Sequence, residues 1–124
     1  KDHPLAEQAS IQLRELVSYP LILPLRDRVR AEILNWLQCD EKDLHIPLYY
    51  TLLSNTALLV EAGLGCAFCL DGALSIHSSP ELRFVPISPE HTTCSVLVWK
   101  KNQLFSPATS LFIQEINLLR ASME

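Results

Sequence analysis

The chain has 124 residues, of which 48% are hydrophobic and 19% are charged, which predicts one folded domain with a single core. Ten basic residues against fourteen acidic ones give a net charge of −4, so the chain lacks the basic stripe that nucleic-acid binding requires. Glu61 and the glycines interrupt the apolar segments well before the roughly 20 residues of a membrane helix. We therefore expect a soluble protein that contacts no membrane.

The first residue and the cysteines predict the context of the protein. The chain opens on Lys1 rather than on methionine, and no secretory leader follows, so we expect a fragment of a longer protein. Cysteines stand at positions 39, 66, 69 and 94, in apolar or strand-like contexts rather than in a small loop-rich framework. This placement favours reduced thiols and a cytoplasmic protein.

The first part of the chain predicts a helix, a strand and a second helix. Ser10 is the expected N-cap of a short helix that ends before Tyr19. The apolar run "PLILPL" predicts a buried parallel strand at about residues 20–24. The spacing changes at Asp27, and a helix over 27–38 follows. Its inward face is expected to hold Val29, Ile33, Trp36 and Leu37.

The middle of the chain repeats this alternation. The segment "LHIPLYY" predicts a short strand that ends at Tyr50, and Ser54 or Asn55 is expected to cap the next helix. Gly63 stands where a left-handed residue closes a helix, and Gly65 lets the chain reverse onto a buried strand, "CAFCL". A phosphate-binding loop is the weaker interpretation, because such loops precede a helix. The inward stripe of this helix is expected to be Leu58, Leu59 and Ala62.

The last third predicts a helical turn in "DGALSI", strands in "LRFVPI" and "TTCSVLVWKK", and a final helix. Ser106 followed by Pro107 marks the start of that helix. Strands that alternate with helices predict the α/β class, as a three-layer sandwich whose mainly parallel sheet is covered on both faces. The apolar face of the last helix is expected to hold Leu111, Phe112, Ile116 and Leu119.

No pattern in the sequence predicts an enzyme, a cofactor or a metal site. Cys66 and Cys69 have C-x-x-C spacing, but residues three apart on a strand point to opposite faces, so we interpret them as core cysteines. Neither a histidine pair at zinc spacing nor a G-x-S-x-G elbow is present. The scattered candidates for catalytic groups are Ser54, His3, His45, His77, His91, Asp27 and Asp71.

Two loops carry the main functional signal. Arginines at positions 26, 28 and 30 stand at the front of the second helix. They form either a solvated face with Asp27 as the cap, or an anion site where Arg26 and free backbone N–H groups meet a carboxylate. Thr51, Ser54 and Asn55 offer either caps or ligand contacts after the next strand. Both loops are expected at one edge of a parallel sheet, where one ligand can contact both.

Segments along nearly the whole chain resemble the effector-binding domain of LysR-type transcriptional regulators. The most specific is "V-x-A-G-L-G" entering a buried strand, and the order and intervals of the segments also match. The usual Leu-Pro after that strand is replaced here by Leu70-Asp71. The segments are "DHPLA" at 2–6, "LRELVSYPLIL" at 13–23, "LLVEAGLGCAFCL" at 58–70, "LRFVPI" at 82–87 and "LVWKKNQLFSPATSLFIQEI" at 97–116.

The resemblance implies a periplasmic-binding-protein-like fold of type II, in which two lobes hold a small-molecule effector between them. The chain then covers the second lobe, over about 4–92, and the return crossover strand with the last helix of the first lobe, over about 93–122. The winged helix that binds DNA lies outside the chain, so the fragment itself contacts no nucleic acid. A homo-oligomer is expected, and the alternatives are a lobe of a solute-binding protein of a transport system and a small thiol-dependent enzyme.

The resemblance also assigns the effector cleft. A polar residue is usual in the family where Leu25 stands, so the effector is expected to be a small carboxylate or a more apolar compound. The expected role is ligand sensing without chemistry. The residues assigned to the cleft are Pro24, Leu25, Arg26, Thr51, Leu53 and Ser54.

Overall fold

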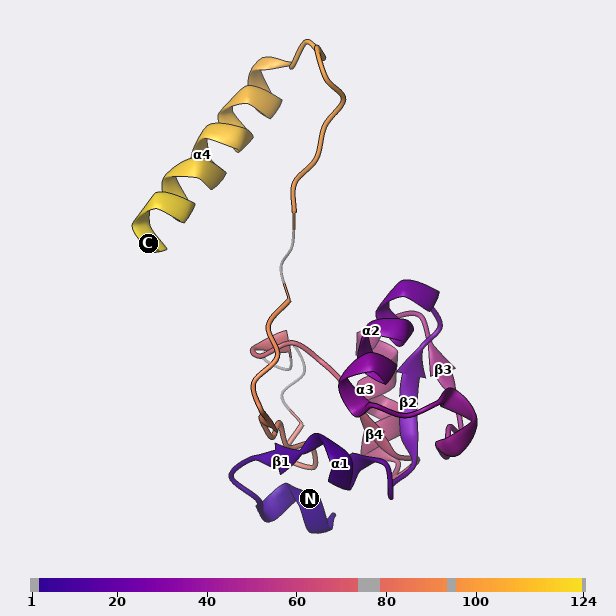
Figure 1. The fold of residues 1–124 in the computed structure, drawn as a ribbon. Coiled ribbons are helices and arrows are strands. Elements are labelled where there is room, and N and C mark those ends of the chain that lie inside the picture. The colour runs from indigo at the N-terminus through magenta and orange to yellow at the C-terminus, as the bar shows by residue number, and fades with distance from the viewer. Residues whose placement is uncertain (1–2, 74–78, 94–95, 124) are drawn as a thin grey trace. The chain divides into compact units, whose positions relative to one another are not determined.

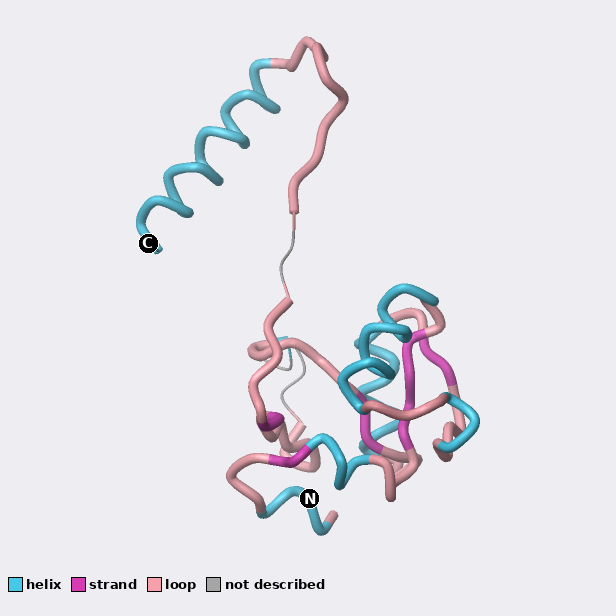
Figure 2. The backbone as a smooth tube through the Cα atoms, in the orientation of Figure 1, coloured by secondary structure: helices cyan, strands magenta, loops and turns pink. Residues whose placement is uncertain are grey.

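The computed structural model describes residues 3–73, 79–93 and 96–123. The chain falls into two compact units, residues 1–92 and 93–124 (Figure 1). Figure 2 shows that helices, short strands and loops alternate along the first unit. In the described residues, no helix is both long and apolar enough to cross a membrane.

The first unit is built around a parallel sheet of three short strands. β2 (Leu21–Pro24) lies in the centre, between β3 (Tyr49–Tyr50) and β4 (Cys66–Ala67). α2 (Asp27–Leu37) connects β2 to β3, and α3 (Leu53–Glu61) connects β3 to β4. These connections cross the sheet in opposite directions, and right-handed crossovers place their helices on opposite faces. The α/β class and the parallel sheet predicted from the sequence are confirmed.

β2 is buried on both faces. Leu21, Ile22 and Leu23 have no exposed surface, as expected of a central parallel strand. Leu21 and Leu23 point to one face, where they belong to a core cluster with Ile33 and Leu37 of α2. Ile22 points to the opposite face. The continuous apolar run in the sequence therefore reflects burial by a helix layer on each side.

A second pairing joins the start of the unit to its end. The Ile11 N–H donates to the Pro86 carbonyl at 2.8 Å, and β1 and β5 run parallel. Ser10 was predicted to cap a helix, and this is wrong, because the long-range pairing keeps Ile11 extended and α1 begins only at Leu13. The short elements of this unit are η1 (Pro4–Glu7), β1 (Ile11–Gln12), α1 (Leu13–Leu16), η2 (Glu41–Asp43) and β5 (Ile87–Ser88).

Gly63 and Gly65 shape the connection from α3 to β4 as predicted. Gly63 has φ +79°, and its N–H donates to the Val60 carbonyl at 2.9 Å. Gly65 has φ +152°, and a Cβ atom there would lie 2.5 Å from the Pro20 carbonyl oxygen. The same oxygen accepts the Cys66 N–H at 2.8 Å. The pairing of β4 with β2 therefore requires a residue without a side chain at position 65.

The buried face of α3 differs from the predicted one. Thr56 and Ala57 are buried, because small residues let the helix approach the sheet closely. The Thr56 hydroxyl donates to the Leu52 carbonyl at 3.0 Å, which satisfies it inside the helix. The residues predicted to face inward that are exposed instead are Val29 of α2, Leu58 of α3 and Ala62, which directly follows α3.

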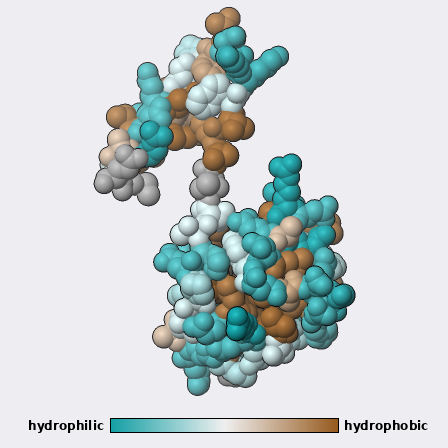
Figure 3. Space-filling model, viewed as in Figure 1, coloured by the Kyte–Doolittle hydropathy of each residue, from teal (hydrophilic) through white to brown (hydrophobic). Residues whose placement is uncertain are grey.

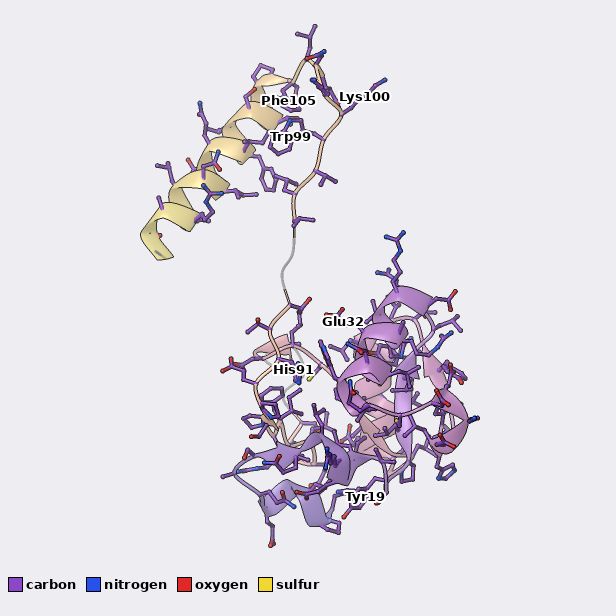
Figure 4. The ribbon with its side chains drawn as sticks, viewed as in Figure 1. Tyr19, Glu32, His91, Trp99, Lys100 and Phe105 are labelled. Carbon is purple, nitrogen blue, oxygen red and sulfur yellow. The ribbon has the colours of Figure 1, made fainter. Side chains whose placement is uncertain are left out.

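The second unit contains an extended segment and α4 (Pro107–Met123). The Ser106 Oγ accepts the Thr109 N–H at 3.2 Å, and Pro107 occupies the first helical position, so the predicted start of this helix is confirmed. Trp99 lies edge-on to Phe105, with 5.9 Å between ring centroids (Figure 4).

Four predicted strands are shortened or unpaired where the structure describes them. Only Tyr49–Tyr50 of "LHIPLYY" and Cys66–Ala67 of "CAFCL" belong to strands, and the latter two residues are half-buried rather than buried. Only Ile87 of "LRFVPI" belongs to a strand, and residues 92–93 and 96–101 of "TTCSVLVWKK" belong to none. An alternating pattern forms a strand only beside a partner that accepts its hydrogen bonds. The predicted turn in "DGALSI" lies partly outside the described residues. Apolar side chains exposed in this unit (Figure 3) include Val96, Val98, Leu104, Leu111, Phe112, Leu118 and Leu119.

Candidate functional site

The carboxyl ends of β2 and β3 lie side by side at one edge of the sheet. The strands are parallel with Pro24 in register with Tyr50, and the Leu25 N–H donates to the Tyr50 carbonyl at 2.8 Å. Each strand is followed by two residues and then by a helix. We call the region formed by residues 24–26 and 51–54 the carboxyl edge. It is the position where open α/β sheets bind ligands.

All the predicted site residues belong to the carboxyl edge. Pro24, the last residue of β2, is buried, and Leu53 is half-buried at the start of α3. Sequence reasoning missed Leu52, whose side chain is 59% exposed between Thr51 and Leu53. Its position between two predicted cleft residues, directly before the helix start, is the signal that could have identified it. The exposed predicted residues are Leu25, Arg26, Thr51 and Ser54.

Neither helix at this edge has a side-chain cap. Arg26 is the N-cap of α2 and Leu52 is the N-cap of α3, and neither side chain bonds to its helix. Ser54 and Asn55 were predicted as caps, and this is wrong, because α3 begins one residue before Ser54 and both residues lie in its first turn. The first backbone N–H groups of two helices therefore reach this edge without a capping oxygen.

The arginines near the start of α2 have different environments. The Arg30 side chain is 18% exposed, and its guanidinium donates to the carbonyls of residues 24–25 at 3.2 and 2.9 Å and pairs with Asp27 at 2.7 Å. Asp27 was one predicted cap of α2, but its carboxylate neutralises Arg30 instead. Arg26 and Arg28 are exposed and form no ion pair with a described residue. Arg26 is therefore the cation that the carboxyl edge presents.

Tyr49 and Tyr50 fix β3 on its two faces. The Tyr49 hydroxyl donates to Glu41 Oε1 at 2.5 Å, and the Arg30 Cζ lies 5.3 Å from the centroid of the Tyr49 ring. The Tyr50 hydroxyl donates to the Phe68 carbonyl, just past β4, at 3.2 Å. The hydrogen bond to Glu41 raises the pKa of Tyr49, and burial raises the pKa of Tyr50. Both hydroxyls stay protonated at neutral pH and act as donors.

The cysteines in the described residues are free. Cys66 and Cys69, interpreted from the sequence as core cysteines, are half-buried, and Cys66 packs against the core cluster with its Sγ 3.8 Å from His3 Nε2. Burial raises the pKa of the Cys39, Cys66 and Cys69 thiols, and the carboxylates of neighbouring aspartates raise those of Cys39 and Cys69 further. Among the described residues, no three metal-ligating side chains gather. Cys94 and His77 lie outside the described residues.

We expect Cys66 and Cys69 to react slowly with iodoacetamide in the folded protein at pH 7. The thiolate is the reactive form, and a raised pKa lowers the thiolate fraction at any pH below it, so labelling should accelerate as the pH rises. Mass spectrometry of the time course, with the guanidinium-unfolded chain as the reference, measures this. Rapid labelling of either thiol in the folded state would support the thiol-dependent enzyme instead.

Two histidines among the candidate catalytic groups have structural partners. His3 Nδ1 accepts the Leu5 N–H at 3.3 Å at the start of η1. The His91 ring stacks on Trp36, with 4.9 Å between ring centroids. The other ring nitrogen of His3, Nε2, lies 3.8 Å from Cys66 Sγ.

Comparison with protein families places the chain. A family model, the LysR substrate binding domain, matches residues 1–119, and comparison with curated proteins gave no match. Domains of this family are the effector-binding parts of LysR-type transcriptional regulators, are regulatory rather than catalytic, and have a type II periplasmic-binding-like fold. The parallel sheets and mixed helices described above agree with that fold. Because the match covers almost the whole chain, the protein belongs to the family of LysR substrate-binding domains.

Proposed function

We propose that this chain senses a small-molecule effector for a LysR-type transcriptional regulator, and that the effector binds at the carboxyl edge. The observation that carries the proposal is the convergence of two helix starts without side-chain caps at one edge of the sheet. Backbone N–H groups at helix starts bind anions. The family match favours a regulator over a lobe of a transport protein.

The chemistry of the carboxyl edge favours a carboxylate with an apolar body as the effector. Arg26 supplies a cation without a described ion-pair partner, and guanidinium groups bind carboxylates through two parallel hydrogen bonds. Leu25 and Leu52 are 54% and 59% exposed, so each loop also offers apolar surface. A few polar groups beside apolar surface are the chemistry that small-molecule sites combine.

The division of the chain supports a specific assignment of lobes. Residues 4–92 are proposed as the second lobe, and residues 93–122 as the return crossover strand and the last helix of the first lobe. The boundary between the two compact units, after Thr92, agrees with this assignment. The rest of the effector pocket then comes from the first lobe.

The proposal for the parent protein follows from this assignment. Effector binding changes the relative placement of the two lobes, and hence of the DNA-binding arms of a cytoplasmic homo-oligomer. The chain itself performs no chemistry, holds no cofactor and touches DNA only through the winged helix of its parent.

A titration of the ¹⁵N-labelled chain tests the site. Benzoate, hexanoate and acetate are compared with benzamide, the uncharged counterpart of benzoate. We expect chemical-shift changes at amides of residues 25–28 and 51–55 with at least one carboxylate and none with benzamide. Equal changes with benzamide, or no change with any carboxylate, would overturn the proposed carboxylate site.

Replacing Arg26 with glutamine should weaken binding of the responding carboxylate about tenfold, since hydrogen bonds to charged groups contribute roughly 1.5–3 kcal/mol. Arg14→Gln, on the exposed surface of α1, is the matched control and should leave the affinity unchanged. Equal weakening by both variants would indicate an effect of net charge alone.

A further inference from the structure

Arg30 gathers groups from four consecutive elements around the carboxyl edge. Its guanidinium donates to the Pro24 and Leu25 carbonyls, at 3.2 and 2.9 Å, at the end of β2. It also pairs with Asp27 of α2 at 2.7 Å, and its Nε lies 3.4 Å from the Glu41 carboxylate of η2. Glu41 accepts a hydrogen bond from the hydroxyl of Tyr49 in β3, and the Arg30 Cζ lies 5.3 Å from the centroid of the Tyr49 ring.

These contacts clamp the peptide groups that leave β2 from two sides. The Leu25 N–H is held by the Tyr50 carbonyl of β3, whereas the Leu25 carbonyl is held by Arg30 of α2. The conformation of the two residues before α2 is therefore set by partners on both neighbouring elements. An element fixed in this way loses little entropy when a ligand binds to it.

We infer that Arg30 is a positioning residue for the effector loop, residues 24–26. Its charge is compensated by Asp27 and Glu41, and its guanidinium holds the backbone of the loop. The exposed Arg26 is therefore the cation that contacts the ligand. This inference rests on the proposed function of the carboxyl edge. It assigns the two arginines different roles: Arg26 contacts the effector, and Arg30 prepares the loop that carries Arg26.

The planar guanidinium fork is essential to this role. Its Nη1 donates to the two carbonyls and its Nη2 to the Asp27 carboxylate, while its Cζ lies over the Tyr49 ring at 5.3 Å from the centroid. An ammonium group keeps the charge but has neither the fork nor the flat face. Arg30→Lys therefore separates geometry from charge.

Amide hydrogen exchange measured on the whole chain, in the absence of any ligand, tests the positioning role. The Leu25 amide reports on the loop, and the Leu23 amide, which donates to the Leu48 carbonyl at 3.3 Å, reports on the strand. We expect Arg30→Gln and Arg30→Lys each to raise the exchange rate of Leu25 about tenfold, the effect of losing one charge-assisted hydrogen bond. The Leu23 rate should stay unchanged. Arg28→Gln, one exposed arginine earlier in the same helix, should change neither rate.

Three results would overturn the inference. The first is an unchanged exchange rate of the Leu25 amide in Arg30→Gln. The second is an equal rise in the exchange rates of Leu23 and Leu25, which indicates general destabilisation. The third is a wild-type exchange rate of Leu25 in Arg30→Lys. The same variants are then titrated with benzoate or whichever of the three carboxylates binds the wild type. Arg30→Lys should weaken its binding about tenfold at an unchanged melting temperature. If no carboxylate binds the wild type, the proposed site fails while the exchange result still decides whether Arg30 holds the loop.

Discussion

Replacing Gly65 with alanine is expected to destabilise the first unit by about 3 kcal/mol. The new Cβ atom forces a backbone shift, and the alanine must adopt a φ that is unfavourable for a residue with a side chain. The ideal Cβ lies 2.5 Å from the Pro20 carbonyl oxygen, which is backbone and cannot rotate away. The same oxygen holds the Cys66 N–H, so the shift also separates β4 from β2. Urea unfolding monitored by circular dichroism measures the loss of unfolding free energy.

Gly63→Ala is the matched control for this experiment. Gly63 also has a positive φ, +79°, but no atom lies within 4 Å of the position of its Cβ. It therefore carries only the conformational cost, about 1 kcal/mol. Equal losses for the two variants would show that the close approach of Gly65 to Pro20 does not determine stability.

Replacing Leu21 with alanine should cost about 3 kcal/mol or more, within the range measured for buried leucines. Leu21 has no exposed surface and packs in the core cluster on the face of β2 that α2 covers. Its neighbours come from both ends of the first unit, so little collapse into the cavity is expected. Leu70→Ala, at a position 58% exposed, should change the unfolding free energy by less than about 0.5 kcal/mol. A loss below 1 kcal/mol for Leu21→Ala would contradict the central position of β2.

The features that sequence predicted correctly have local causes. The proline-flanked run of β2, the helical spacing of α2, the turn at Gly63 and the Ser106-Pro107 start of α4 each depend on residues within a few positions of one another. Such short-range signals predict local structure without knowledge of the distant contacts of the chain. The alternation of these strands and helices along the chain was also sufficient to predict which loops share an edge of the sheet.

The features that sequence reasoning missed depend on distant partners. The extended conformation of Ile11 requires the Pro86 carbonyl, and the burial of Thr56 in preference to Leu58 requires the sheet beneath α3. The strand predicted at residues 92–101 needs a neighbouring strand, which the described residues do not supply.

The shared sheet edge of the two candidate loops was predictable from the sequence, but the contacts within it were not. Parallel topology placed the loops, and the sequence singled out Arg26, but it gave Arg30 no role of its own. Arg30 differs because the fold brings Glu41, Tyr49 and two backbone carbonyls to it. Backbone acceptors have no signature in residue identity, so the contacts of Arg30 could not be predicted from the sequence.

The parallel pairing of β2 with β3 has an electrostatic consequence that the overall charge conceals. Each strand is followed by a helix at the carboxyl edge. The positive ends of two helix dipoles, each equivalent to roughly half an elementary charge, therefore lie at the same edge. A molecule with a net charge of −4 thereby acquires a local attraction for anions that its titratable groups alone do not account for. Because main-chain groups supply that potential, it persists at any pH at which the domain stays folded.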